Sequence, residues 1–142
     1  MSYGTDQETF MKASRQSVDF FNIRQANLYK GLIVEEFEET MKAMADLENA
    51  LRSPGIRDYS KIVSEVSDGC IDLIYVSLGL LHSLGVEPDL AWDEVHSSNM
   101  TKIDKETGRV LKDPQTGKVL KPSTFRYPDM LGVVQECWGI PR

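Results

Sequence analysis

Two long stretches of helical periodicity constrain the fold of this chain more than any other feature. Across residues 22–51, apolar side chains recur at steps of three or four, the period of an amphipathic helix. These side chains are Ile33, Phe37, Met41, Met44, Leu47 and Leu51. Ser53-Pro54-Gly55 predicts the end of this helix. A second helix is predicted over residues 59–84, with Gly85 as its stop. From Gly69 onward it is apolar nearly all round, which predicts a central place in the fold.

Shorter helices are expected around this pair. Residues 7–21 predict a short helix followed by a turn, and residues 128–138 predict one more short helix. Pro88 suits the first turn of a helix that runs to about Met100. A chain of 142 residues fits one domain, and no linker composition interrupts it. We therefore predict an all-α fold, a four- to five-helix bundle in a single domain over residues 1–142.

A repeated segment near the C-terminus departs from the helical pattern. The sequence Thr107-Gly108-Arg109-Val110-Leu111-Lys112 is echoed by Thr116-Gly117-Lys118-Val119-Leu120-Lys121, and Asp113-Pro114-Gln115 stands between them. Two β-prone arms around a proline turn predict a short β-hairpin-like flap.

Composition narrows the possible partners. The net charge of −6 argues against a general nucleic-acid binder, because phosphate backbones require clustered Lys and Arg. The longest apolar stretch, residues 70–86, contains Asp72 and His82 and is too short and polar for a membrane span. The first residues do not resemble a signal peptide. Cys70 and Cys137 match no metal or redox spacing, so we expect reduced thiols in a cytoplasmic protein.

Acidic residues form a stripe on each long helix. Glu35, Glu36 and Glu39 point to one side of the first helix, where like charges repel by a few tenths of a kcal/mol, roughly. Glu38 alone is interpreted as part of a solvated face. On the second helix, the residues of the stripe follow one another at steps of three and four. They are Glu65, Asp68 and Asp72.

Asp72 lies within the apolar run of residues 71–76, so we expect it to be buried. A buried carboxylate must be paired, hydrogen-bonded or bound to metal. One alternative is therefore a structural Asp satisfied by an Arg or a backbone amide. The other is a metal site, because two acidic stripes packed face to face would offer the oxygen ligands that Mg²⁺ prefers. We favour the metal site, since such repulsion persists only where something offsets it.

Other metal chemistries fit the sequence less well. Di-iron carboxylate bundles need Glu-x-x-His on each of two helices, whereas Gly79 and Asp93 precede His82 and His96 by three residues. A zinc site would require a His/Cys cluster, which is absent from the sequence. The sequence also has no His-Asp dipeptide, which excludes a histidine-based HD-type phosphohydrolase.

Basic residues gather after the helix predicted to begin at Pro88, which ends with Asn99 and Lys102. The alternative is that those two residues are ordinary caps of the helix. Further basic residues follow at Lys105, Arg109, Lys112, Lys118, Lys121 and Arg126. A basic flap facing an acidic metal cage would suit a triphosphate, whose charge shifts during phosphoryl transfer. A solvated hairpin is the alternative.

Together these motifs resemble the MazG-like all-α NTP pyrophosphohydrolase superfamily, whose pattern is Glu-Glu-x-x-Glu on one helix and Glu-x-x-Asp on the next. The matching segments are Glu35-Glu36-Phe37-Glu38-Glu39 and Glu65-Val66-Ser67-Asp68, with Asp72 one turn later. The branch of dimeric-dUTPase-like and phage MazG-like proteins is resembled by residues 72–76, 84–86, 94–102, 117–122 and 127–129. The resemblance covers about residues 8–136. In several relatives a Glu stands at the position of Gly69.

The resemblance implies metal-dependent hydrolysis of a (deoxy)nucleoside triphosphate to the monophosphate and pyrophosphate. It implies two to three Mg²⁺ ions per site, with Mn²⁺ as a substitute, and Glu36 as the base that accepts a proton from water. The implied metal ligands are Glu35, Glu36, Glu39, Asp68 or Glu65, and Asp72.

The resemblance also implies substrate contacts. Asn99 and Lys102 would contact phosphate or sugar, and Lys118 and Lys121 would close over the polyphosphate. Asn22 and Gln25, with Phe21, are candidates for a base pocket, and a plain helix start with ordinary packing is their alternative.

Several alternatives stay open at this stage. The substrate is dUTP, dCTP, dGTP or a modified nucleotide. The chain is alternatively a nucleotide-binding protein of the same fold with weakened catalysis, or a helical module whose acidic stripes bind a basic partner. The apolar second helix predicts a homodimer or a dimer of dimers, because one small bundle cannot cover it.

Overall fold

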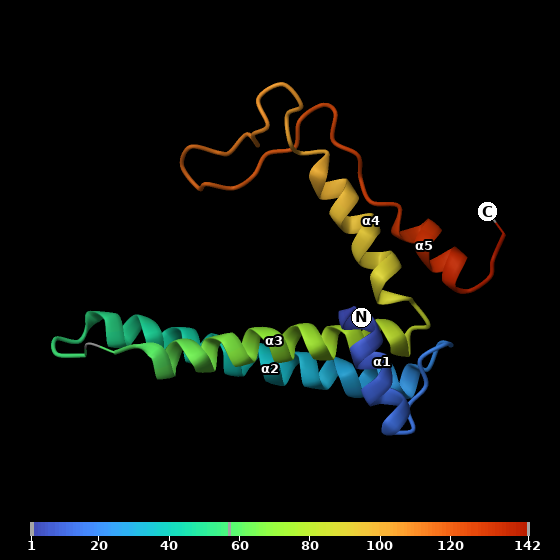
Figure 1. Ribbon diagram of the computed structural model, residues 1–142, viewed down its shortest axis with the longest axis horizontal. Helices are drawn as coiled ribbons and strands as arrows, with labels where there is room; N and C mark the ends of the chain where they lie inside the picture. The colour runs from blue at the N-terminus through green and yellow to red at the C-terminus, as the bar shows by residue number, and fades with distance from the viewer. Residues whose placement is uncertain (1, 57, 142) are drawn as a thin grey trace. The chain divides into compact units, whose positions relative to one another are not determined.

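The computed structural model describes residues 2–56 and 58–141, and the regular structure in this part of the chain is helical. The helices are α1 (Tyr3–Ala13), α2 (Ile23–Arg52), α3 (Ser60–Ser83), α4 (Pro88–Met100) and α5 (Met130–Cys137) (Figure 1). The predicted all-α fold is confirmed, and only α1 begins several residues earlier than expected. None of the helices in the described ranges is both long and apolar enough to cross a membrane. The chain divides into two compact units, with the boundary after Gly85. A single domain over residues 1–142 remains a prediction.

The first unit is built on α2 and α3, which lie side by side and run antiparallel (Figure 1). Two glycines of α3 mark where the helices approach most closely. A Cβ atom at Gly79 would lie 2.1 Å from the ring of Tyr29, and one at Gly69 would lie 2.5 Å from Oγ1 of Thr40. Tyr29 and Thr40 are both buried. The small residues on α3 therefore set the distance between the two helices.

The remaining contacts of the first unit gather at the C-terminal end of α3. Helix α1 packs there, and Nε2 of the buried His82 lies 3.0 Å from the carbonyl oxygen of Gly4. A backbone bridge joins Phe21 to Leu84 just before α2 begins. Gly85 has φ +67°, and a Cβ atom there would lie 3.1 Å from the backbone of Phe20. This conformation confirms the predicted stop of α3.

Two expectations about α3 are wrong for the protomer. Helix α3 contacts α2 and α1 and is not surrounded by other helices of its unit, so Ile71 is 61% exposed and Ile74 is 51% exposed. Asp72 is exposed as well, rather than buried in the apolar run. The reason is that the first unit has only one layer of long helices, which leaves the far side of α3 uncovered. The carboxylate of Asp72 therefore stays in contact with solvent and needs no partner to offset burial.

The second unit contains α4, α5 and, between them, two turns of the same construction. The backbone N–H of Asp104 donates to the carbonyl of Arg109, and its carboxylate accepts from the N–H of Thr107 at 2.7 Å. Nine residues later, Asp113 repeats this with Lys118 and Thr116. Gly108 and Gly117 have φ of +64° and +69°, as these turns require.

The predicted hairpin is confirmed, since Lys112 and Val119 pair across the second turn. A first turn, closed by the pair Ile103 and Val110, was not predicted. The repeat is longer than the sequence interpretation recognised, because it begins at the aspartate that opens each turn. It runs over residues 104–112 and again over 113–121.

Candidate functional site

An acidic hollow of about 370 Å³ lies on the α2–α3 pair. Helix α2 contributes Glu36, Glu39 and Asp46, and helix α3 contributes Glu65, Asp68 and Asp72. Five of the six predicted metal ligands thus line one hollow. The sixth, Glu35, does not line it but lies close enough for its charge to act on Glu36. The structure therefore brings the two predicted acidic stripes together.

Helix geometry explains why these carboxylates line the same hollow. On each helix the acidic residues follow one another at steps of three, four or seven, which keeps them on one side. Gly69 lines the same hollow and faces Thr40 of α2. A larger residue at Gly69 would meet the Thr40 Oγ1 atom at 2.5 Å and its Cα at 3.3 Å. A side chain at this position would therefore require Thr40 to shift.

The electrostatics of the hollow centre on Glu36, which is partly buried. Its pKa is raised above the ordinary value, first by partial burial and then by the surrounding negative charges. Those charges belong to Asp72, Glu39, Glu35 and Asp68, in decreasing order of effect. Lys42 also lines the hollow, but its ammonium group pairs with Asp46 at 2.8 Å. The carboxylates around Glu36 therefore repel one another, and a divalent cation would relieve that repulsion.

The donors in the hollow fit magnesium or manganese in their chemistry. All are carboxylate oxygens, the ligands that these hard cations prefer. Within residues 2–56 and 58–141, however, no group of three or more acidic, His or Cys side chains already converges in a metal-binding arrangement. Glu39, Asp68 and Asp72 are exposed, so their side chains have room to turn inward. Coordination would require that rotation.

The predicted base-pocket residues are engaged within the protein. Asn22 caps α2, since its Oδ1 accepts a hydrogen bond from the backbone N–H of Gln25 at 3.2 Å. The amide of the buried Gln25 donates to the carbonyl of Ser17 at 2.7 Å and to the hydroxyl of Ser83 at 2.8 Å. Its Oε1 accepts from the N–H of Ser17 at 3.0 Å. These hydrogen bonds fit the alternative of a plain helix start with ordinary packing. The contact of Asn22 and Gln25 with a base remains a prediction.

The predicted phosphate contacts all lie in the second unit. Lys102 Nζ donates to Oδ1 of Asn99 at 2.7 Å. Lys102 and Lys121 both place their ammonium groups over the ring of Phe125. Lys118 lies in the second turn, where its side chain is exposed. The sequence interpretation gave no role to Phe125 or Tyr127, although both rings follow soon after Lys121.

The helical fold and the acidic hollow agree with a comparison against family models. The class of the chain is the MazG-like all-α NTP pyrophosphohydrolase superfamily. Within it, the model described as phosphoribosyl-ATP pyrophosphohydrolase matches residues 7–99, and the chain belongs to this family. The match includes all of α2 and α3 and therefore the whole hollow. A comparison with curated proteins gave no match. Pyrophosphohydrolysis of a nucleotide is the reaction of the family.

Proposed function

We propose that this protein hydrolyses a (deoxy)nucleoside triphosphate to the monophosphate and pyrophosphate at the acidic hollow. The observation that carries the proposal is that carboxylates of α2 and α3 line one hollow, where partial burial and the neighbouring negative charges raise the pKa of Glu36. An acidic residue with a raised pKa in a concave site is a candidate catalytic group. Family membership supplies the reaction class.

A triphosphate of the nucleotide pool is proposed as the substrate, in place of the phosphoribosyl-ATP of the family description. The support comes from the end of the family match, which closes at Asn99, and from the sequence that follows it. Residues 94–102 and 117–122 resemble the dimeric-dUTPase-like and phage MazG-like branch. Such enzymes act on nucleoside triphosphates, and dUTP, dCTP, dGTP and modified nucleotides are the candidates.

Two to three Mg²⁺ ions, or Mn²⁺ in their place, would neutralise the triphosphate and lower the pKa of a bound water. Glu35, Glu36, Glu39 and Asp72 are proposed as ligands. Glu65 and Asp68 both line the hollow, and either would replace the ligand absent at Gly69.

Glu36 is proposed to accept the proton of the attacking water at its carboxylate. Its place in the hollow supports this role, because cations held by the neighbouring carboxylates would bring a bound water close to Glu36.

The substrate contacts are proposed on chemical grounds. Lys102, Lys118 and Lys121 offer ammonium groups to phosphate oxygens, and Asn99 offers an amide to phosphate or sugar. Asn22 and Gln25 would contact a base only by exchanging their present hydrogen bonds.

A homodimer or a dimer of dimers is proposed as the assembly. Phe37 and Met41 of α2 and Ile71 and Ile74 of α3 are each close to half exposed or more in the protomer. Helix faces this apolar are usually covered in a stable protein. Light scattering on the purified protein tests this, and a monomer at micromolar concentration would contradict it.

The proposed reaction is tested by incubating the protein with each of the eight common NTPs and dNTPs, and with phosphoribosyl-ATP, in the presence of Mg²⁺. We expect equal amounts of monophosphate and pyrophosphate from one or a few triphosphates, abolished by EDTA. Hydrolysis of phosphoribosyl-ATP alone would assign the chain to that substrate. Nucleotide binding without turnover would favour the weakened binding protein, and binding of a basic peptide alone would favour the interaction module.

A further inference from the structure

The second unit holds a cluster of two lysines and two aromatic rings: Lys102, Lys121, Phe125 and Tyr127. The Nζ atoms of Lys102 and Lys121 lie 5.4 and 5.1 Å from the centroid of the Phe125 ring. Lys121 Nζ also lies 4.6 Å from the centroid of the Tyr127 ring. The two rings meet edge to face, with centroids 4.8 Å apart. Two ammonium groups therefore share one aromatic surface.

This aromatic–lysine cluster concentrates positive charge. Each ammonium group is attracted to the electron-rich faces of the rings, but the rings carry no net charge. Among the ion pairs of the described ranges, none joins Lys102 or Lys121 to a carboxylate. Asn99, which accepts from Lys102, is neutral. The two positive charges thus lie over the same ring, and both remain available to an anion.

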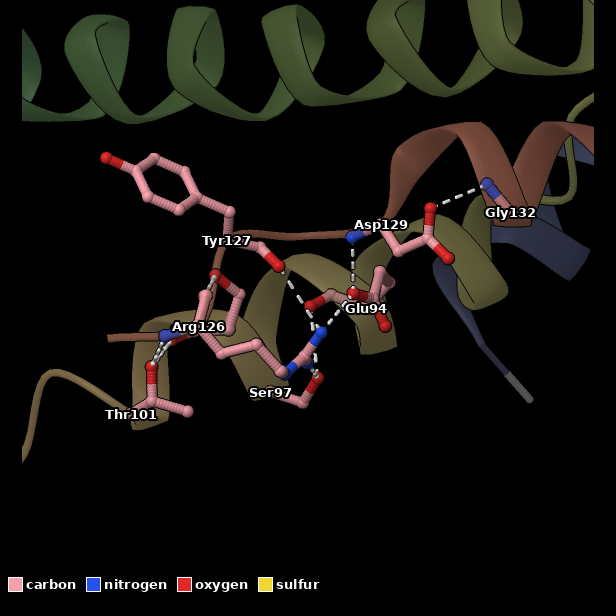
Figure 2. A network of polar contacts seen from close by, with 8 residues as sticks. Glu94, Ser97, Thr101, Arg126, Tyr127, Asp129 and Gly132 are labelled. Atoms are coloured by element: carbon pink, nitrogen blue, oxygen red, sulfur yellow. Dashed lines mark hydrogen bonds and ion pairs between the residues drawn. The ribbon is translucent and has the colours of Figure 1, made fainter. Parts of the chain in front are cut away.

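Arg126 fixes the segment that carries the two rings. Its backbone N–H donates to Oγ1 of Thr101 at 2.9 Å, and its carbonyl accepts from the hydroxyl of Ser98 at 2.7 Å. Its guanidinium contacts Glu94 and Ser97 of α4. Figure 2 shows the Tyr127 ring projecting away from this network.

The two rings stand on either side of Arg126 in the sequence. Phe125 and Tyr127 contact each other, whereas the Arg126 guanidinium contacts Glu94 and Ser97 of α4. The arginine and the pair of rings therefore make separate contacts. The rings are held by the backbone of their own segment rather than by deep burial, since Tyr127 is 69% exposed.

We propose that Phe125 and Tyr127 are positioning residues that gather Lys102 and Lys121 into one binding site for the phosphate groups of the substrate. A free lysine side chain samples many rotamers, and ordering two of them on a phosphate costs free energy. The rings confine both ammonium groups before the phosphate arrives. Phosphate oxygens then replace part of the contact with the rings, because a charged acceptor binds an ammonium group more strongly than a ring does. The inference rests on the proposed function for the identity of the ligand.

The first test is made on the protein without substrate. A proton held over an aromatic ring shows an upfield shift in its NMR signal. We expect upfield ε-methylene signals for Lys102 and Lys121, with those of Lys112 as the control in the exposed repeat. In Phe125→Leu the Lys102 signals should move to the position of Lys112, whereas those of Lys121 should keep the part of the shift that is due to Tyr127. Phe125→Tyr should keep both upfield shifts. Ordinary positions for both lysines in the wild-type protein would overturn the proposal.

The second test measures binding of inorganic pyrophosphate without a divalent cation. We expect Phe125→Leu to bind about tenfold more weakly than the wild type, and Phe125→Tyr to bind within twofold of it. Leu111→Ala, which removes an exposed apolar side chain from the same unit, serves as the matched control. Equal pyrophosphate affinity in Phe125→Leu and the wild type would overturn the proposal.

Kinetics separate this inference from the proposed function. On the best triphosphate, Phe125→Leu should raise KM about tenfold and leave kcat within twofold, because the phosphates are bound in ground state and transition state alike. Upfield lysine signals and ring-dependent pyrophosphate binding without hydrolysis of any triphosphate would remove the proposed reaction and keep the phosphate site. Hydrolysis with an unchanged KM in Phe125→Leu would keep the proposed reaction and remove the phosphate site.

Discussion

The two units of this protein position their charged side chains by different means. In the first, carboxylates stand at helical spacing on α2 and α3, and the close contacts of Gly69 and Gly79 bring the two rows together. In the second, aspartate carboxylates bind the backbone of two turns, and aromatic rings hold the lysines. The acidic side is organised by packing between long helices. The basic side is organised by local hydrogen bonds and ring contacts.

The difference teaches where each unit is vulnerable. Helix packing is cooperative, so damage at one α2–α3 contact is felt by the whole acidic row. Turns held by their own side chains respond locally, and an exposed turn can open without unfolding the rest of the protein. Substitutions in the first unit should therefore change global stability, and substitutions in the second should change local order.

The largest effect is expected at the closest helix contact. Gly79→Ala places a methyl group against the buried Tyr29 ring, so we expect a loss of about 3 kcal/mol in the free energy of unfolding. Gly31→Ala on α2 is the matched control, since a Cβ atom there meets nothing within 4 Å. That control should stabilise the helix by up to about 1 kcal/mol. Denaturant unfolding checks both, and equal effects of the two would contradict the packing account.

A smaller effect is expected at Gly69. Gly69→Ala should cost about 1–2 kcal/mol, because the nearest atom, Thr40 Oγ1, belongs to a side chain, whereas Thr40 Cα lies farther off. Thr40→Ala removes that oxygen and should relieve part of the clash. A double-mutant cycle measures the coupling between the two positions, and a coupling energy near zero would show that the helices do not meet there.

In the second unit we expect a local response at the Arg126 network. Arg126→Ala removes the guanidinium contacts to Glu94 and Ser97, and exposed pairs of this kind are worth up to about 1 kcal/mol. Hydrogen exchange at the Asp129 amide, which donates to Glu94, should become several-fold faster. Arg52→Ala, at an exposed pair on α2, is the control. A large drop in the free energy of unfolding in Arg126→Ala would contradict the expectation that the second unit responds locally.

The smallest effect concerns acid. The backbone amides of Thr107 and Thr116 lower the pKa of Asp104 and Asp113 below their ordinary values. A lowered pKa in the folded state means that the turn is stabilised above the ordinary pKa and loses that stabilisation as the pH falls through the lowered value. The two amides should therefore become less protected on acidification, as seen by NMR. Asp104→Asn keeps an acceptor for Thr107, so its turn should lose this pH dependence.

Local features of the sequence predicted the first unit well. The bounds of α2 and the acidic rows depend on the period of a helix, which is set by residues a few positions apart. The exposure of Asp72 could not be predicted in this way, because burial depends on how many other helices cover α3. The hydrogen bond of Gln25 could not be predicted either, because its partner Ser83 lies on another helix.

The second unit was harder to predict from the sequence. The repeat was visible, but the role of Asp104 and Asp113 depends on side-chain hydrogen bonds to the backbone rather than on periodicity. The pairing of Lys102 with Phe125 joins the end of α4 to a segment beyond both turns. Only the folded chain shows that these turns return Phe125 to that helix end.

The most direct test of the central claim compares two carboxylates of the first unit in one assay. Asp72 lines the acidic hollow, whereas Glu38 lies on α2 outside it and is exposed. With the best triphosphate and Mg²⁺, we predict that Asp72→Asn lowers the rate of pyrophosphate release by about a hundredfold or more and that Glu38→Gln leaves it within twofold. Equal rates in Asp72→Asn and the wild type would place the chemistry elsewhere and contradict the account.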